Sequence, residues 1–203
     1  MKLYDDKRAP NPRRVRVFLA EKEIDVERVD VDIMKEVHRN DDNRALNPFT
    51  GVPFLVLDDG TVIAETVAIC RYFEELYPSN PLFGETPLEK ALVEMWQRRA
   101  ELGLFQAIAH AFRHSNPYMA ELENPQIAEW SKVNLERIDG YLDKFEDALA
   151  KTPYIAGQTY SIADITTLVA IDFMRVLRLR LTDKHPNLVE WYSRVSVRPG
   201  SVK

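Results

Sequence analysis

The chain has 203 residues, 45% of them hydrophobic and 29% charged, and its formal net charge at pH 7 is −5. This is the composition of a globular protein, and the acidic balance gives no reason to expect nucleic acid or an anionic membrane as a partner. No apolar run is long enough to span a bilayer, and the first residues lack the pattern of a secretory signal. The single cysteine, Cys70, excludes an internal disulfide framework, so we expect a cytoplasmic protein.

Residues 1–77 alternate short β-branched segments with helical patterns, in the order β-α-β-α-β-β-α of a thioredoxin-like domain. The first helix should follow the turn at residues 9–12, with Asn11 as its N-cap and Pro12 as its first residue. The strands are expected at residues 1–4, 26–31, 54–57 and 61–64, and the helices from residue 12, within 34–44 and at 66–77.

The last two strands of this domain form a predicted hairpin, because they flank an Asp-Asp-Gly turn at residues 58–60. Pro53 fits only at a strand start, since it donates no ladder hydrogen bond. A cis bond into this proline would leave the Val52 backbone facing outward, where an extended peptide can pair with it. Beyond the hairpin, Thr66 is the expected N-cap of a helix whose free amides suit an anion, and Glu65 offers a carboxylate. This arrangement suits a peptide-like ligand that carries both an ammonium group and a carboxylate.

Residues 78–87 are rich in proline and form the expected linker, and residues 88–203 show helical patterns only. Long amphipathic helices are expected at residues 89–114 and about 125–150. Ser161 and Asp164 form a predicted capping box at the start of a nearly all-apolar helix, so we expect Asp164 to be structural. The sequence therefore predicts two domains, at residues 1–77 and 88–203.

The motif at residues 47–53 (Asn-Pro-Phe-Thr-Gly-Val-Pro), the hairpin after it and the Glu65-Thr66 pair resemble the glutathione-binding half of a cytosolic glutathione S-transferase of bacterial type. Residues 161–164 resemble the capping motif of that family's helical domain, and residues 185–192 resemble its closing helix. This resemblance covers nearly the whole chain. It implies an α/β thioredoxin-like N-terminal domain, an all-α helical-bundle C-terminal domain, glutathione as co-substrate and a two-fold homodimer.

The resemblance also implies contacts with each part of glutathione. Val52, with Pro53 beside it, should pair with the cysteinyl backbone, and Glu65 with Thr66 should hold the γ-glutamyl end. The glycyl carboxylate needs a cation or a hydroxyl group, and the candidates in the right region are His38, Arg39 and Thr50.

The second substrate, a small hydrophobic electrophile, should bind between the domains on the long helix after the linker. One side of this helix mixes apolar and polar side chains, and although most of it is expected to be core, one or two members should face the cleft. These residues are Arg99, Leu102, Phe105, Gln106 and His110. His110, His114 and His185 have no partners at metal-ligand spacing, so no metal site is expected.

Members of this family activate the thiol with a tyrosine, serine or cysteine between the first strand and the first helix. Aligning residues 14–16 (Arg-Val-Arg) with the similar segment of serine-type members places Ala9 at the catalytic position, and alanine cannot donate a hydrogen bond. Asn11 is one candidate replacement, since Ala-Pro-Asn here is similar to the Thr-Pro-Asn of some bacterial members that act on glutathione disulfides. Tyr4 is another candidate, although it lies within the predicted strand. Cys70 is expected to be inert packing.

Three functions stay open at this point. The resemblance favours conjugation of glutathione to small hydrophobic electrophiles. The missing serine and the presence of Asn11 favour a glutathione-dependent disulfide or peroxide reductase. A non-catalytic binding protein on the same fold is favoured by Ala9 and opposed by the intact Val-Pro and Glu-Thr elements.

Overall fold

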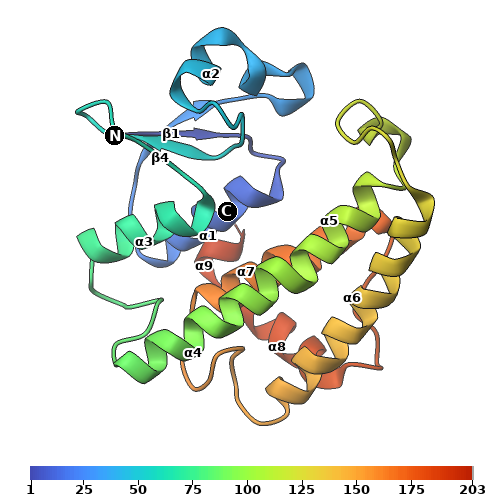
Figure 1. Cartoon of the computed structure of the whole chain (residues 1–203). Helices are drawn as coiled ribbons and strands as arrows, with labels where there is room; N and C mark the ends of the chain where they lie inside the picture. Colours follow the sequence, from blue (N-terminus) through green and yellow to red (C-terminus); the bar gives the residue numbers. More distant parts are fainter. Residues whose placement is uncertain (203) are drawn as a thin grey trace. The chain divides into compact units, whose positions relative to one another are not determined.

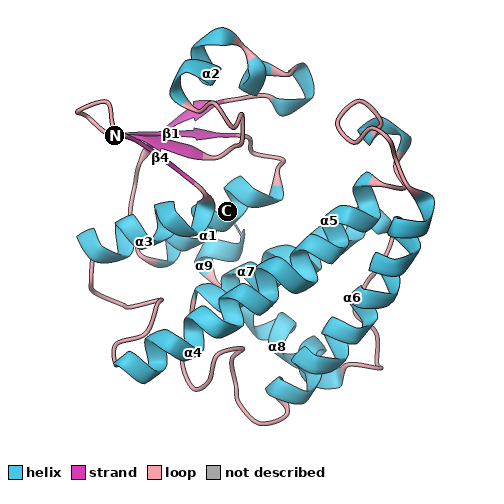
Figure 2. Cartoon of the chain, in the orientation of Figure 1, coloured by secondary structure: helices cyan, strands magenta, loops and turns pink. Residues whose placement is uncertain are grey.

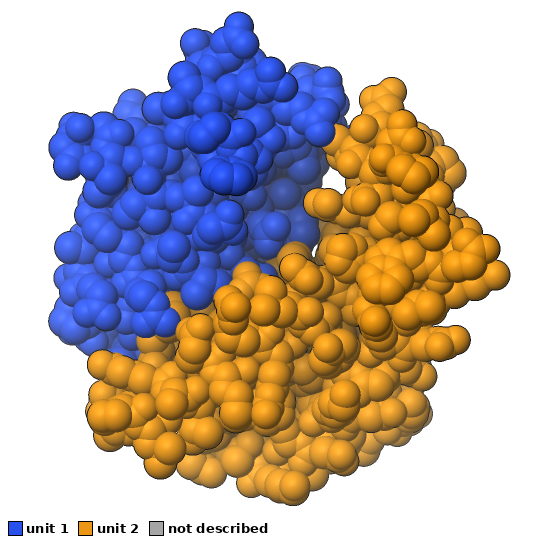
Figure 3. Space-filling model, in the orientation of Figure 1, with its two compact units in different colours: residues 1–81, 199–203 blue, residues 82–198 orange. Residues whose placement is uncertain are grey.

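The computed structural model describes residues 1–202, which divide into two units that Figure 3 colours separately. The first unit comprises Met1–Pro81 and helix α9 (Pro199–Val202), and the second comprises Leu82–Arg198. This division differs from the predicted limits at two places. Helix α9 lies with the first unit because it packs against α1. Part of the predicted linker belongs to the second unit, because Leu82 and Phe83 are buried there.

The first unit is built on a four-stranded sheet with the strand order β2-β1-β3-β4. Strand β1 runs parallel to β2 and antiparallel to β3, and β3 forms the predicted hairpin with β4. Figure 2 shows these strands together in magenta. Their bounds are β1 Lys2–Asp5, β2 Glu27–Asp30, β3 Phe54–Val56 and β4 Val62–Ala64.

Helices α1 (Pro10–Glu21) and α3 (Thr66–Leu76) pack against each other on one side of the sheet, and α2 (Asp41–Leu46) lies on the other side (Figure 1). The helices bury their apolar stripes, as the spacing of those residues predicts. Fully buried members include Val15, Phe18, Ile69, Cys70 and Phe73. The region predicted as one short helix is divided instead into η1 (Ile33–Lys35), η2 (Val37–Arg39) and α2. Glu36 with its left-handed backbone (φ +55°) separates the first two, and Asn40 with an extended backbone separates η2 from α2.

In its described residues the second unit consists of helices, with a single isolated β-bridge between Tyr154 and Gly157. The predicted helix at residues 89–114 contains a π-helical segment, η3, that joins α4 to α5. In this segment Gly103 approaches Tyr141 so closely that a Cβ atom would lie 2.4 Å from the tyrosine ring. The bounds are α4 Pro87–Arg98, η3 Arg99–Phe105, α5 Gln106–Arg113, η4 Pro117–Met119, α6 Ala128–Leu149, α7 Ile162–Phe173, η5 Met174–Leu177 and α8 Pro186–Val195. No helix in the described part of the chain has both the length and the apolar character needed to cross a membrane.

Asp164 holds the centre of the second unit together, as the capping box predicts. Its Oδ2 atom accepts the Ser161 N–H at 3.0 Å, and its Oδ1 atom accepts the Ile155 N–H at 2.9 Å and the Trp191 indole N–H at 2.8 Å. The side chain is completely buried, and burial raises the pKa of this carboxyl group to about 6 in spite of these donors. Asp164 thus joins the start of α7 to a loop and to α8.

This raised pKa predicts how stability depends on pH. The folded chain binds the Asp164 proton more tightly than the unfolded chain, whose aspartate titrates near its ordinary pKa of 3.8. The stabilisation by protonated Asp164 is therefore complete below about pH 4 and is lost as the pH rises to about 6. Relative to an Asp164→Asn variant, which has no carboxyl group at this position, the wild type should lose about 3 kcal/mol of unfolding free energy across this range.

Urea unfolding at a series of pH values measures this difference. The exposed carboxylate of Asp183 supplies the control, because Asp183→Asn should follow the wild-type curve. If the wild type and Asp164→Asn run parallel from pH 4 to 7, the pKa of Asp164 is not raised.

Candidate functional site

Three segments of the first unit meet at one end of its sheet. Tyr4, Phe54 and Ala64 lie in one row across β1, β3 and β4. Just beyond this row, β1 leads through residues 6–9 into α1, β3 is entered from Val52 and Pro53, and β4 continues into α3. The register of the strands therefore brings together the segments that carry four of the predicted glutathione contacts, Val52, Pro53, Glu65 and Thr66.

The loop before β3 is held by Asn47, which is 4% exposed. The Asn47 side chain donates to the Gly51 carbonyl at 2.9 Å and accepts from the Phe49 N–H at 3.3 Å. The bond between Val52 and Pro53 is cis. Among the residues that the structure describes, no hydrogen bond uses the Val52 N–H or carbonyl. Both groups thus remain available to an extended ligand.

Glu65 and Thr66 stand at the start of α3, but not in the predicted roles. Thr66 as N-cap was a wrong prediction: Glu65 leaves β4 with a left-handed backbone (φ +68°) and is the N-cap, and Thr66 is the first helical residue. The Glu65 side chain is exposed, whereas Thr66 is 6% exposed and its Oγ1 atom accepts a hydrogen bond from Arg14 Nη1 at 2.5 Å. The first bond of the helix runs from the Ile69 N–H to the Glu65 carbonyl, so the preceding amides lack helical partners.

The start of α1 also differs from the prediction, because Ala9 rather than Asn11 is the N-cap. Pro10 fixes a helical φ, so the helix begins before Asn11. Since Pro10 and Pro12 have no N–H, Asn11 supplies the single backbone donor among the first three residues of the helix. The Asn11 side chain is exposed and makes no hydrogen bond within the described part of the chain, so its amide is also free to meet a ligand. The Ala9 methyl group is buried and offers no donor.

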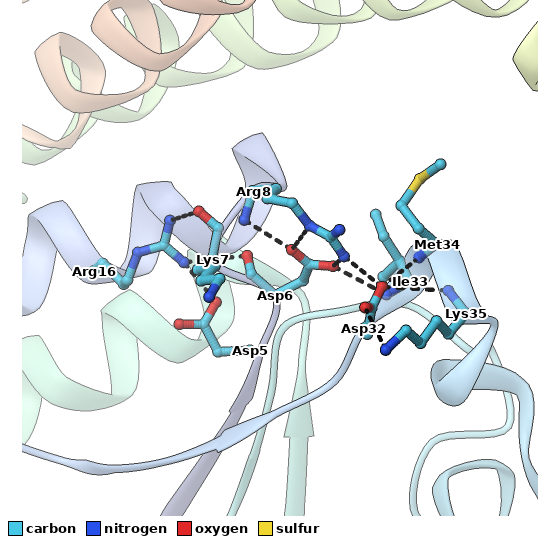
Figure 4. Close-up of polar contacts among 9 residues, drawn as sticks. All are labelled: Asp5, Asp6, Lys7, Arg8, Arg16, Asp32, Ile33, Met34 and Lys35. Atoms are coloured by element: carbon cyan, nitrogen blue, oxygen red, sulfur yellow. Dashed lines mark hydrogen bonds and ion pairs between the residues drawn. The ribbon is translucent and has the colours of Figure 1, made fainter.

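Two arginines fix the loop between β1 and α1, as Figure 4 shows. Arg16 donates to the Asp5 carboxylate at 2.6 Å and to the carbonyls of Asp6 and Lys7 at 3.2 and 3.0 Å. Arg8 donates to Asp6 at 3.1 Å and also pairs with Asp32. The loop before Ala9 is therefore held from two sides.

Asp6 lies at the centre of this loop and is 1% exposed. It also accepts the N–H of Arg8 at 2.7 Å and the N–H of Ile33 at 2.9 Å. Burial alone would raise the pKa of Asp6, but these hydrogen bonds and the Arg8 guanidinium hold it below its usual range. The sequence showed only a short charged run here, and no pattern in that run indicated that one acid would be buried.

The candidates for the glycyl carboxylate differ in their surroundings. His38 is half-buried, and its Nδ1 atom is shielded from solvent without a partner among the described residues. Burial lowers the pKa of His38, which favours the neutral imidazole. Arg39 pairs with Glu36 at 3.0 Å, and Thr50 is half-buried with a left-handed backbone (φ +56°).

Tyr4, the other candidate for thiol activation, lies inside β1. Its ring stacks on Phe54 with 4.4 Å between the ring centroids and 14° between the ring planes. This contact occupies one face of the ring in packing across the sheet.

The predicted second-substrate residues lie in η3 and α5 of the second unit. Arg99, Leu102 and Gln106 are exposed. Phe105 is 6% exposed and packs in the core, where its ring centroid lies 5.8 Å from that of Phe173. His110 is half-buried, and burial lowers its pKa. Its Nδ1 atom has no partner in the described part of the chain.

The other histidines of the second unit make structural contacts. The Nδ1 atom of His114 accepts the Ile127 N–H at 3.1 Å, and the Nε2 atom of His185 lies 2.9 Å from Asp143. The residues that the structure describes contain no group of three or more histidine, cysteine, aspartate or glutamate side chains placed to hold a metal ion.

Comparison with known families adds an independent finding. The sequence model of "Glutathione S-transferase, N-terminal domain" matches residues 9–76, and that of "Glutathione S-transferase, C-terminal domain" matches residues 104–199. Glutathione S-transferase 2 of Saccharomyces cerevisiae is 37% identical over 206 aligned positions, which cover 100% of this chain and 88% of the yeast protein.

Solved structures agree with the sequence comparison. A glutathione S-transferase domain-containing protein of Marinobacter aquaeolei is 36% identical with a TM-score of 0.94, over 99% of this chain and all of that one. Gtt2 of Saccharomyces cerevisiae is also 36% identical, with a TM-score of 0.93 over 100% of this chain and 99% of that one. The expected fold, a thioredoxin-like domain followed by an all-helical one, is thereby confirmed. The chain belongs to the glutathione S-transferase family.

Proposed function

We propose that this protein is a glutathione transferase that conjugates glutathione to small hydrophobic electrophiles. The observation that carries the proposal is the meeting of Val52, Glu65 and Thr66 at one end of the sheet. An open strand-like backbone, an exposed carboxylate and a helix start then lie together. Glutathione carries a matching peptide backbone, ammonium group and carboxylate.

Each part of glutathione has a proposed contact. The cysteinyl backbone pairs with the free Val52 N–H and carbonyl by strand addition, next to Pro53. The γ-glutamyl ammonium group meets Glu65, and the γ-glutamyl carboxylate meets Thr66 and the free amides of α3. His38 or Thr50 meets the glycyl carboxylate. Arg39 is a weaker candidate, because it is already paired with Glu36.

Thiol activation falls to Asn11, since Ala9 offers no donor. A free thiol has a pKa of about 8.5 and reacts as the thiolate. The Asn11 N–H and its side-chain amide are neutral donors, and the prolines on either side remove the other amides of the first turn. We therefore propose that the pKa of the bound thiol falls only part-way.

This incomplete activation favours a second candidate function, the glutathione-dependent reduction of disulfides or peroxides. A thiol whose pKa is close to the ambient pH attacks disulfides best. Partial activation of the thiol should therefore slow disulfide exchange less than it slows conjugation. The missing hydroxyl at Ala9 also leaves open a third candidate function, a glutathione-binding protein without catalytic activity. An assay for conjugation or for disulfide reduction distinguishes this candidate from the two enzymes.

The second substrate is proposed to bind on η3 and α5. Arg99, Leu102 and Gln106 offer exposed apolar and polar groups there, and His110 adds an imidazole. Phe105 would support this surface from the core. We further propose a cytoplasmic location, which suits a chain with one buried cysteine and no possible internal disulfide.

Glutathione affinity should depend on Glu65. Glu65→Ala leaves the ligand's ammonium group without its carboxylate and should weaken binding about tenfold, or about 1.4 kcal/mol. The fold should stay intact, because the Glu65 side chain is exposed. Isothermal titration calorimetry measures the affinity, and Glu75→Ala removes an exposed carboxylate from the same helix as a control. Equal affinity in the wild type and Glu65→Ala would place the ammonium site elsewhere.

The bound thiol should titrate at higher pH in Asn11→Ala than in the wild type, because the side-chain donor is lost. Asn11→Ser, which keeps a donor, should fall between the two. Conjugation of a chloronitroarene should be weak at neutral pH and rise with pH in all three proteins. At neutral pH the rate at which glutathione reduces a small mixed disulfide should match or exceed the rate of conjugation. Thiolate absorbance of bound glutathione follows the titration, and an unmoved curve in Asn11→Ala would show that another group activates the thiol.

The protein should be a homodimer in solution. Phe49 and Tyr118 are 87% and 85% exposed, and these large apolar side chains are suited to be covered by a second subunit. Multi-angle light scattering at micromolar concentration should give twice the mass of one chain, and Phe49→Ser should lower the dimer fraction. A monomer mass for the wild type would contradict the proposal.

A further inference from the structure

Arg14 is a fully buried cation beside the proposed glutathione site. It lies in α1 between the apolar core residues and is 0% exposed. Its Nη1 atom donates to Thr66 Oγ1 at 2.5 Å, which joins α1 to the start of α3. Thr66 is itself 6% exposed, so this contact is shielded from water.

The contact determines which way the Thr66 hydroxyl group donates. A guanidinium has donors only, so the Thr66 oxygen must accept this bond, and the hydroxyl proton must point to another acceptor. Within the described part of the chain, the Thr66 hydroxyl donates to no acceptor. A threonine inside a helix usually donates to the carbonyl four residues earlier, but Thr66 is the first residue of α3. Its hydroxyl is therefore left as a donor at the helix start.

Charge acts in the same direction as this geometry. The first amides of α3 carry the positive end of the helix dipole, and the Thr66 hydroxyl lies among them at the first helical position. A carboxylate placed here would meet a hydroxyl donor held by Arg14 and the free amides of the helix start.

We propose that Arg14 is a positioning residue for glutathione: it holds the Thr66 hydroxyl as a donor to the γ-glutamyl carboxylate and makes the site selective for ligands that carry this carboxylate. The inference rests on the proposed glutathione site. It adds a buried residue that need not touch the ligand. It also identifies one carboxylate as the group that this residue selects.

A double-mutant cycle with two ligands tests the inference. The variants are Arg14→Met, Thr66→Val and the double variant, and the ligands are glutathione and an analogue whose γ-glutamyl group is replaced by 4-aminobutanoyl, which lacks only that carboxylate. Each single variant should bind glutathione with about tenfold or more lower affinity than the wild type. The double variant should bind it no more weakly than the weaker-binding single variant does. The affinity for the analogue should change less than about twofold in all three variants. Thr66→Ser, which keeps the hydroxyl, should bind like the wild type.

Controls separate positioning from folding. Arg13→Met removes the same charge from the neighbouring position of α1, where the guanidinium contacts the Ser201 carbonyl, and should leave both affinities unchanged. Thermal unfolding reports the fold of each variant. If Arg14→Met does not fold, Arg14→Lys replaces it. This variant keeps the charge but not the geometry of the guanidinium, and it should still lower the affinity for glutathione more than the affinity for the analogue.

The possible failures are distinguishable. If the affinity losses of the two single variants add up in the double variant, or if both ligands lose affinity equally, Arg14 has only a structural role. Neither result would contradict the proposed glutathione site. A wild-type protein that binds neither ligand would overturn the glutathione site and this inference together.

Discussion

The proposed site depends on the register of one row of strand pairs, Tyr4 to Phe54 to Ala64. A slip of one residue between β1 and β3 would turn either the buried Leu3 or its partner Leu55 toward the opposite face of the sheet, so burial fixes the register strongly. The segments after β1, before β3 and after β4 are then brought to the same end. The core thus positions the proposed ligand contacts, of which Thr66 is itself buried.

The same end of the sheet places two helix starts of different character beside each other. The start of α3 has free amides, a threonine hydroxyl and a buried arginine, so it is strongly suited to an anion. The start of α1 has prolines at two of its first three positions and no side-chain cap, so it is poorly supplied with donors. This contrast is the reason why the proposal treats glutathione binding and thiol activation separately. In the proposed complex the γ-glutamyl carboxylate would meet several donors at the start of α3, while the thiol would meet a single asparagine.

The sequence predicted the features that depend on local chemistry. The hairpin followed from the Asp-Asp-Gly turn, and the capping box followed from the spacing of Ser161 and Asp164. Both helix caps at the site were misplaced by one or two residues, since the left-handed backbone of Glu65 and the early start at Pro10 depend on how the strands end. The contact between Arg14 and Thr66 joins residues 52 positions apart, so no local pattern indicates it.

Buried acids organise a loop in each unit, and their different partners give them different responses to pH. Asp164 has only neutral donors, and burial raises its pKa. Asp6 is also buried, but with Arg8 beside it its pKa is lowered, and hydrogen bonds from Arg8 likewise lower the pKa of Asp32. Asp6 and Asp32 therefore stay ionised from neutral to alkaline pH, and the ion pairs that Arg8 makes with them persist throughout this range. Under the proposed function, a change in glutathione chemistry within that range is therefore not caused by loss of the Arg8 ion pairs.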